Sequence, residues 1–135
     1  MSTLPVLNSS AKEKVVARIN RNSKLFKTIL QALTDKKASH IVSLDLRKIP
    51  EAVADFFVIC EAGSTTQVKA IADHVEFAVR QVCKEAPYRH EGTQALQWVL
   101  VDYVNVVVHI FQPETRKFYR LEEMWSDASV LEHND

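Results

Sequence analysis

Except between Ile19 and Leu25, residues 15–33 carry apolar side chains at a spacing of three or four positions, which places them on one face of a helix. The cluster Asn8, Ser9 and Ser10 can cap this first helix, and the polar residues 20–23 could interrupt it. Residues 1–8 show no periodic pattern, so we expect a mobile tail there. We therefore divide the chain into an N-terminal extension (1–23, partly flexible or helical), a domain (24–126) and a polar C-terminal tail (127–135) that we expect to fray.

Two strands and a second helix follow the first helix. Residues 40–46 alternate between apolar and polar side chains, and residues 55–60 form an almost unbroken apolar run. The first pattern is typical of a half-buried strand, and the second predicts a central strand covered on both faces. Ser64 or Thr65 can then cap a helix that ends near Ala86, before Pro87. We expect its core side to hold Val68, Ile71, Ala72, Val75, Phe77 and Val79.

The last third of the chain predicts a hairpin and a closing helix. Residues 96–102 and 106–111 are apolar runs separated by a short polar break, which favours two antiparallel strands after the Glu91-Gly92 turn. Pro113 suits the first turn of a short helix through Tyr119 and Trp125. This order of elements predicts an α/β fold, with a mixed sheet and helices packed on it.

Composition and charge limit the classes of protein to consider. The chain has 135 residues, 47% of them hydrophobic, which suits one domain. We expect a soluble, unexported protein, because no apolar run reaches the ~18 residues of a membrane span. The two cysteines, Cys60 and Cys83, suggest neither a disulfide framework nor a zinc site, which fits the cytoplasm. Residues 1–48 have a net charge of +7 and residues 49–135 one of −7, so each part could meet a partner of opposite charge.

The sequence offers little support for catalysis. A strand, Gly63-Ser64 and a helix form the arrangement with which nucleotidyltransferases hold phosphate, so a nucleotide-binding enzyme stays open as an alternative. No carboxylate pair follows at the spacing that would hold magnesium, and Asp73 and Glu76 suit exposed helix positions better. We expect neither a metal nor a cofactor. We predict that His109 has a hydrogen-bonded structural role. We predict that the Cys60 thiol is protonated.

Binding has more support than catalysis, because large amphipathic side chains lie among acids in the second part of the chain. These side chains are Trp98, Tyr103, Tyr119 and Trp125, residue types that commonly anchor interfaces. Trp98 could lie on an open face of the sheet or under a helix, and the pattern favours neither. Trp125 and Leu121, spaced at i and i+4, are expected to dock the last helix onto the sheet.

Four stretches in this order resemble the ribosomal silencing factors, the Iojap family. They are ADFFVICEAGSTTQVKAIADHV (54–75), Glu91-Gly92, WVLVDYVNVVVHIF (98–111) and ETRKFYRLEEMW (114–125). The resemblance implies a nucleotidyltransferase-like topology without catalytic carboxylates. It also implies a cytoplasmic, noncatalytic factor that binds large-subunit ribosomal protein fourteen and blocks joining of the small subunit when nutrients are scarce.

The resemblance also suggests which residues bind the partner. Trp98 and Asp102 match the family's Trp-x-x-Val-Asp strand, as interface anchor and as a charge offered to a basic ribosomal partner. Tyr119 and Glu122 match its closing Tyr-x-Leu-Glu-x-x-Trp pattern and are also assigned to the interface, whereas Trp125 is assigned to packing.

Two features lie outside the family pattern, and a homodimer stays open as a third hypothesis compatible with ribosome binding. Val104 and Asn105 stand where we expect a glycine and an acid, and valine disfavours positive φ. The basic residues of the extension, Lys12, Lys14, Arg18 and Arg21, could contact ribosomal RNA phosphates or merely lengthen the first helix. An apolar sheet edge could also pair two copies into a homodimer.

Overall fold

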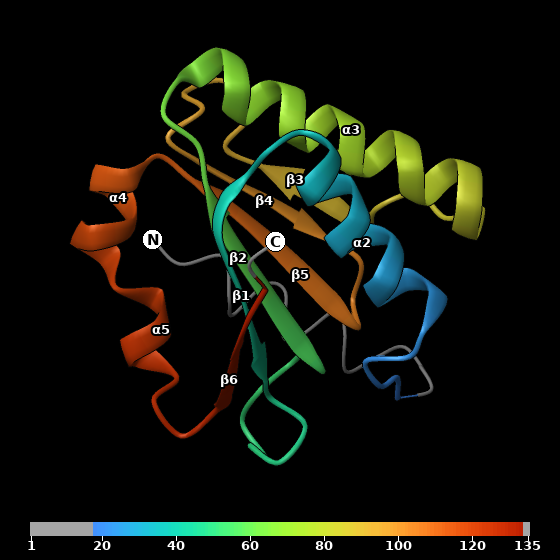
Figure 1. Cartoon of the computed structure of the whole chain (residues 1–135). Coiled ribbons are helices and arrows are strands. Elements are labelled where there is room, and N and C mark those ends of the chain that lie inside the picture. Colours follow the sequence, from blue (N-terminus) through green and yellow to red (C-terminus); the bar gives the residue numbers. More distant parts are fainter. Residues whose placement is uncertain (1–17, 134–135) are drawn as a thin grey trace.

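The computed structural model describes residues 18–133, which form four helices and a six-stranded sheet (Figure 1). The helices are α2 (Lys24–Asp35), α3 (Thr65–Cys83), α4 (Pro113–Tyr119) and α5 (Leu121–Met124). The strands are β1 (Ser39–Asp45), β2 (Phe56–Glu61), β3 (Arg89–Glu91), β4 (Trp98–Asp102), β5 (Val106–Phe111) and β6 (Ser129–Glu132). The cap cluster at residues 8–10 and the basic residues Lys12 and Lys14 lie outside the described part. Among the described residues, no helix is long and apolar enough to span a membrane.

The sheet is mixed, with the strand order β3-β4-β5-β2-β1-β6. β2 and β5 run parallel at its centre, while every other neighbouring pair is antiparallel. The expected hairpin is therefore confirmed as β4 and β5, and the α/β class with a mixed sheet is confirmed too. α3 follows β2 and α4 follows β5, so both helices begin at the same end of the parallel pair.

Side chains of β2 alternate between two apolar cores, one on each face of the sheet. Phe56, Val58 and Cys60 pack with the residues of α2 and α3, and Phe57 and Ile59 pack with Leu121 and Trp125 on the other face. Figure 1 shows α2 and α3 side by side over one face, with α4 and α5 on the opposite side. The prediction of a central strand covered on both faces is confirmed.

Local signals set the limits of α3, but one of its predicted core residues is exposed. The Ser64 hydroxyl accepts a hydrogen bond from the Gln67 backbone N–H, and Lys84 ends the helix in the left-handed conformation at φ 59°. Phe77 is 58% exposed, so its assignment to the core was wrong. It follows the buried Val75 by two residues, which turns it about 200° around the helix, away from the sheet.

The ends of the described chain settle two further predictions. α2 starts at Lys24, where the Ser23 hydroxyl accepts from the Phe26 N–H, and residues 18–23 are not helical. The polar stretch 20–23 therefore does interrupt the helical pattern. The expected frayed tail is wrong, because residues 129–132 form β6 along the edge of β1. All four are exposed, and a strand held by backbone pairing leaves no apolar periodicity to read.

The last helix is divided. Arg120 has a φ of 49° and separates α4 from α5. Leu121 is buried and the Trp125 ring meets the Phe57 ring edge-on at 5.9 Å. These contacts confirm that Leu121 and Trp125 dock this region onto the sheet.

Candidate functional site

A row of side chains crosses three strands at the end of the sheet where α3 and α4 begin. Trp98 of β4 is the register partner of Phe111 in β5, which is in turn the partner of Glu61 in β2. Side chains at paired positions point to the same face. α4 lies on this face, with Tyr119 against Trp98 and Arg116 against Glu61.

Trp98 is half-buried, which combines the two environments considered for it. Its indole stacks on Phe111 at 4.7 Å between ring centroids and lies 4.9 Å from the Tyr119 ring. The indole Nε1–H donates a 3.0 Å hydrogen bond to Nδ1 of His109. The ring is thus held along its inner edge, while part of it reaches the surface.

His109 supports Trp98 from inside the sheet. Only 1% of the residue is exposed, and burial lowers its pKa from 6.5 to about 3. The imidazole is therefore neutral at physiological pH, and because Nδ1 accepts from the indole, the proton lies on Nε2. The prediction of a hydrogen-bonded structural histidine is confirmed.

The neighbouring helix adds two exposed aromatic side chains. Phe118 is 79% and Tyr119 is 49% exposed, and their rings meet at 5.0 Å. We call Trp98, Phe118 and Tyr119 the aromatic surface. Sequence reasoning had singled out Trp98 and Tyr119 but missed Phe118. The available signal was its position directly before Tyr119, in the short helix that Pro113 begins.

An ion-pair network holds α4 in this position. The guanidinium of Arg116 lies 3.1 Å from Glu61 and 2.7 Å from Glu122, and it donates to the His40 carbonyl oxygen at 2.9 Å. The Arg116 side chain is only 10% exposed, and ion pairs of this kind, hydrogen-bonded and largely screened from water, hold a fixed geometry. Glu122 therefore lies near the aromatic surface in the chain, and its carboxylate is already paired with Arg116.

Asp102 is not available to a partner in the way that the sequence suggested. Its side chain is fully buried; Oδ1 accepts from the Val104 N–H at 2.7 Å, and Oδ2 lies 3.6 Å from Nε of Arg89. Asp102 shares the face of Trp98, but it stands at the opposite end of β4. The expectation that its carboxylate is offered to a basic partner was wrong.

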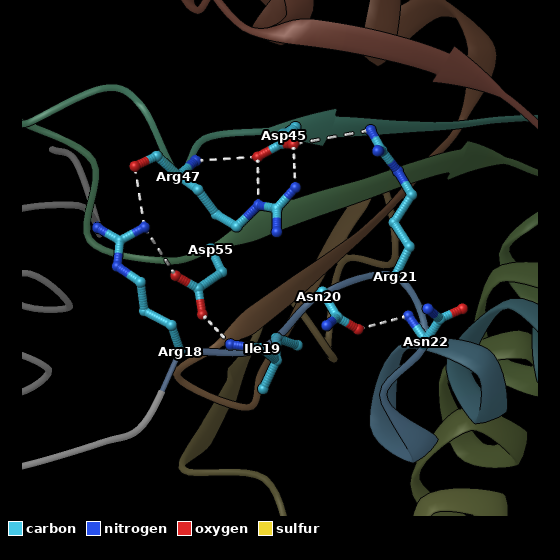
Figure 2. Close-up of polar contacts among 8 residues, drawn as sticks. All are labelled: Arg18, Ile19, Asn20, Arg21, Asn22, Asp45, Arg47 and Asp55. Atoms are coloured by element: carbon cyan, nitrogen blue, oxygen red, sulfur yellow. Dashed lines mark hydrogen bonds and ion pairs between the residues drawn. The ribbon is translucent and has the colours of Figure 1, made fainter.

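Basic side chains gather at that opposite end of the sheet (Figure 2). Asp55 accepts from the Ile19 N–H at 3.0 Å and lies 3.6 Å from Arg18, whose Nη1 also donates to the Arg47 carbonyl oxygen. Arg47 makes two side-chain hydrogen bonds to Asp45, which hold the pKa of that carboxyl below its usual range. These contacts attach the extension to the sheet.

The remaining candidates for chemistry are engaged elsewhere or buried. Burial raises the pKa of the Cys60 thiol to about 12, so the expected protonated thiol is confirmed. Asp73 is exposed and pairs with Lys69 one helical turn away. Within residues 18–133, no group of three histidine, cysteine, aspartate or glutamate residues is placed to hold a metal ion.

Comparison with known proteins identifies the family. The family described as "Ribosomal silencing factor during starvation" matches residues 19–135 of the chain. The chain belongs to this family. It is 39% identical to the ribosomal silencing factor of Halalkalibacterium halodurans over 111 residues, which cover 82% of this chain and 93% of the relative.

Two further comparisons agree with this membership. A crystal structure from Chromobacterium violaceum superposes with a TM-score of 0.72 at 31% identity, and covers 76% of this chain and 84% of the other. Another relative of this chain is a mouse protein named "Mitochondrial assembly of ribosomal large subunit protein 1". It is 35% identical over 74 residues, which cover 53% of this chain and 32% of that protein.

Proposed function

We propose that this silencing factor binds the large ribosomal subunit through the aromatic surface and thereby blocks its association with the small subunit. The observation that carries the proposal is the exposure of Phe118 and Tyr119 beside the half-buried Trp98. Aromatic side chains grouped on a rigid support are the usual anchors of protein interfaces. The names of the relatives support a ribosomal partner, and one of them names the large subunit.

The mechanism requires occupancy alone. A bound protein that covers part of the subunit interface removes contacts that the small subunit must make, and a standard interface buries about 800 Å² on each partner. Repression of translation under nutrient limitation would then follow from how much of the factor is bound. We assign the partner to a large-subunit ribosomal protein on the interface, ribosomal protein fourteen in the family resemblance.

Charge favours a basic protein as that partner. Residues 49–135, which include the aromatic surface, have a net charge of −7. Glu122 and Glu123 follow Tyr119 by three and four residues, and both keep exposed side-chain surface, 31% and 71%. Such charges speed encounter with a basic surface and lose this effect as salt rises.

Sedimentation of purified subunits tests the proposal. Wild-type protein at saturation is expected to keep the two subunits apart, and Phe118→Ala with Tyr119→Ala is expected to restore joining. Phe77→Ala is the matched control, because Phe77 is also an exposed aromatic residue but lies on α3, on the other face of the sheet. If the subunits associate equally well with and without saturating wild-type protein, the proposal is wrong. If the Phe118/Tyr119 variant and the Phe77 variant lose inhibition to the same extent, the aromatic surface is not the binding site.

A second contact, to ribosomal RNA, is proposed for the basic end of the sheet. Residues 18–48 contain eight lysines and arginines against two acids, and Arg18 keeps 66% of its side chain exposed. Each phosphate contact steepens the salt dependence of binding. Arg18→Gln with Lys48→Gln should therefore flatten that dependence, whereas Lys69→Gln on α3 should leave it unchanged. Equal slopes for all three proteins would contradict an RNA contact here.

The proposed factor is noncatalytic, and the enzyme alternative is tested separately. The Ser64 hydroxyl is used as a helix cap, and the hollows beside α4 are lined by Arg116, Glu61 and Glu122, which already pair with one another. Calorimetry with magnesium and millimolar nucleoside triphosphate should give no heat. A saturable signal lost in Ser64→Ala would favour the nucleotide-binding enzyme.

A homodimer through the sheet edge and a cytoplasmic location complete the proposal. Val130 and Leu131 of the edge strand β6 are both exposed, and such edges pair readily with a second copy. Light scattering should show a dimer that Val130→Lys converts to a monomer. A monomer in the wild-type protein would contradict this part alone.

A further inference from the structure

We propose that His109 is a positioning residue of the ribosome-binding surface, because its Nδ1 atom fixes the indole of Trp98 in the orientation that a partner meets. The inference rests on the proposed function of the aromatic surface. It adds a buried residue that would contact no partner and yet would determine how tightly one binds.

The hydrogen bond holds a ring that packing alone leaves partly free. Trp98 is at the first position of β4 and half-exposed, and its indole contacts the rings of Phe111 and Tyr119. Tyr119 is itself 49% exposed and belongs to a short helix. The 3.0 Å hydrogen bond from Nε1 to Nδ1 of His109 fixes the rotation of the indole about its side-chain bonds.

His109 is well suited to this role because its own ring is held in place. It lies fully within the sheet on the central strand β5, 4.6 Å from the Phe57 ring and 6.3 Å from the Phe111 ring. Phe57 also contacts Trp125, the residue that docks α5. The imidazole therefore connects the aromatic surface to the core that supports α5.

A fixed indole should increase affinity by reducing what binding must order. A side chain that moves among rotamers when free loses that freedom in the complex, at a cost to affinity. A hydrogen bond already formed in the free protein removes part of this cost. Loss of a single hydrogen bond to a neutral acceptor typically corresponds to about a three- to tenfold change in an equilibrium constant.

A double-mutant cycle on binding to purified large subunits tests the inference. His109→Phe keeps the ring and removes the acceptor, and Trp98→Phe removes the donor. We expect His109→Phe to weaken binding about tenfold. In the Trp98→Phe background the same substitution should change affinity by less than about twofold. Independent losses in the two backgrounds would overturn the positioning role, since His109 would then act without Trp98.

Two further measurements separate positioning from folding and from the proposed function itself. His109→Asn can place an amide oxygen near the former position of Nδ1. This variant should therefore bind more tightly than His109→Phe, although asparagine fills less of the site than phenylalanine. In wild-type protein, nitrogen NMR should show Nδ1 of His109 without a proton, and a protonated Nδ1 would overturn the inference without any variant. If Trp98→Phe and Trp98→Ala both bind with normal affinity, the proposed role of the aromatic surface is wrong. If these two variants lose affinity while His109→Phe does not, the aromatic surface stays in the proposal and only the role of His109 is rejected.

Discussion

Asn105 and Asp55 are hydrogen-bonded to each other, and each directly precedes one of the two parallel strands. Nδ2 of Asn105 donates to the Asp55 carboxylate at 3.1 Å, while the Asn105 carbonyl oxygen accepts from the backbone N–H of Asp55 at 2.8 Å and of Phe56 at 3.1 Å. The same carboxylate holds the Ile19 N–H. One acidic residue thus connects β2, β5 and the N-terminal extension, and the residue opposite it must be a donor.

We expect Asn105→Asp to destabilise the protein, although an acid is what the family resemblance led us to expect there. A second carboxylate would face Asp55 about 3 Å away and lower the free energy of unfolding by about 2 kcal/mol at pH 7. The loss should shrink as the pH falls towards 4, because a proton shared by the pair relieves the repulsion. Urea unfolding at both pH values checks this, and Asn105→Ala, which lacks the charge, should show no such relief.

Val104→Gly is expected to stabilise the protein. Val104 has a φ of 72°, and the Asn105 N–H donates to the Tyr103 carbonyl oxygen across it, which makes the rare γ-turn. A β-branched residue is strained in this conformation, whereas glycine adopts it freely. The free energy of unfolding should rise by about 1 kcal/mol, measured by urea denaturation. A loss as large as that of Val104→Pro would show that Val104 is not strained.

Gly92→Ala should disturb the support of Trp98. Gly92 has a φ of 82°, and a Cβ placed on it would lie 2.0 Å from the Trp98 carbonyl oxygen. Relief of this overlap requires the β3–β4 turn to move, at a cost of more than about 2 kcal/mol. Thermal unfolding measures the loss. Gly63→Ala is the matched control, since a Cβ at Gly63 meets no atom within 4 Å.

The neutral buried His109 makes stability depend on pH. Burial lowers its folded-state pKa to about 3 from 6.5. Below pH 6.5 this histidine is therefore protonated in the unfolded chain but stays neutral in the folded protein. Stability is full above pH 6.5 and is lost as the pH falls towards 3, by about 2 kcal/mol between pH 7 and 5. His109→Phe should remove this part of the pH dependence in urea titrations. An identical pH profile in both proteins would place the proton elsewhere.

Arg116→Met should loosen α4 and weaken binding to the large subunit. It leaves Glu61 and Glu122 without their shared cation, although it keeps much of the side-chain volume. We expect a loss of about 2 kcal/mol in the free energy of unfolding, together with faster amide exchange in α4. Arg120→Met is the control, because Arg120 pairs with Glu123 at an exposed surface. Unchanged exchange in α4 would show that the helix is held by its apolar contacts.

Local patterns in the sequence predicted most of the elements, and the exceptions have identifiable causes. The limits of β5 and the cap at Ser64 follow from runs and residue types within a few positions. Phe77 was misplaced because apolar character was read without its angle on the helix. β6 was missed because its residues are exposed and only pairing with β1 makes them a strand.

The sequence by itself determined the α/β class, the buried central strand and the choice of Trp98 and Tyr119 as candidate anchors. These properties depend on residue type and on short-range periodicity. The tertiary structure alone decided that Asp102 is buried, that Phe118 joins the surface, and that Trp98 meets His109. Those outcomes depend on strand register and on where α4 crosses the sheet, and many residues acting together set both, so no local stretch of sequence contains them.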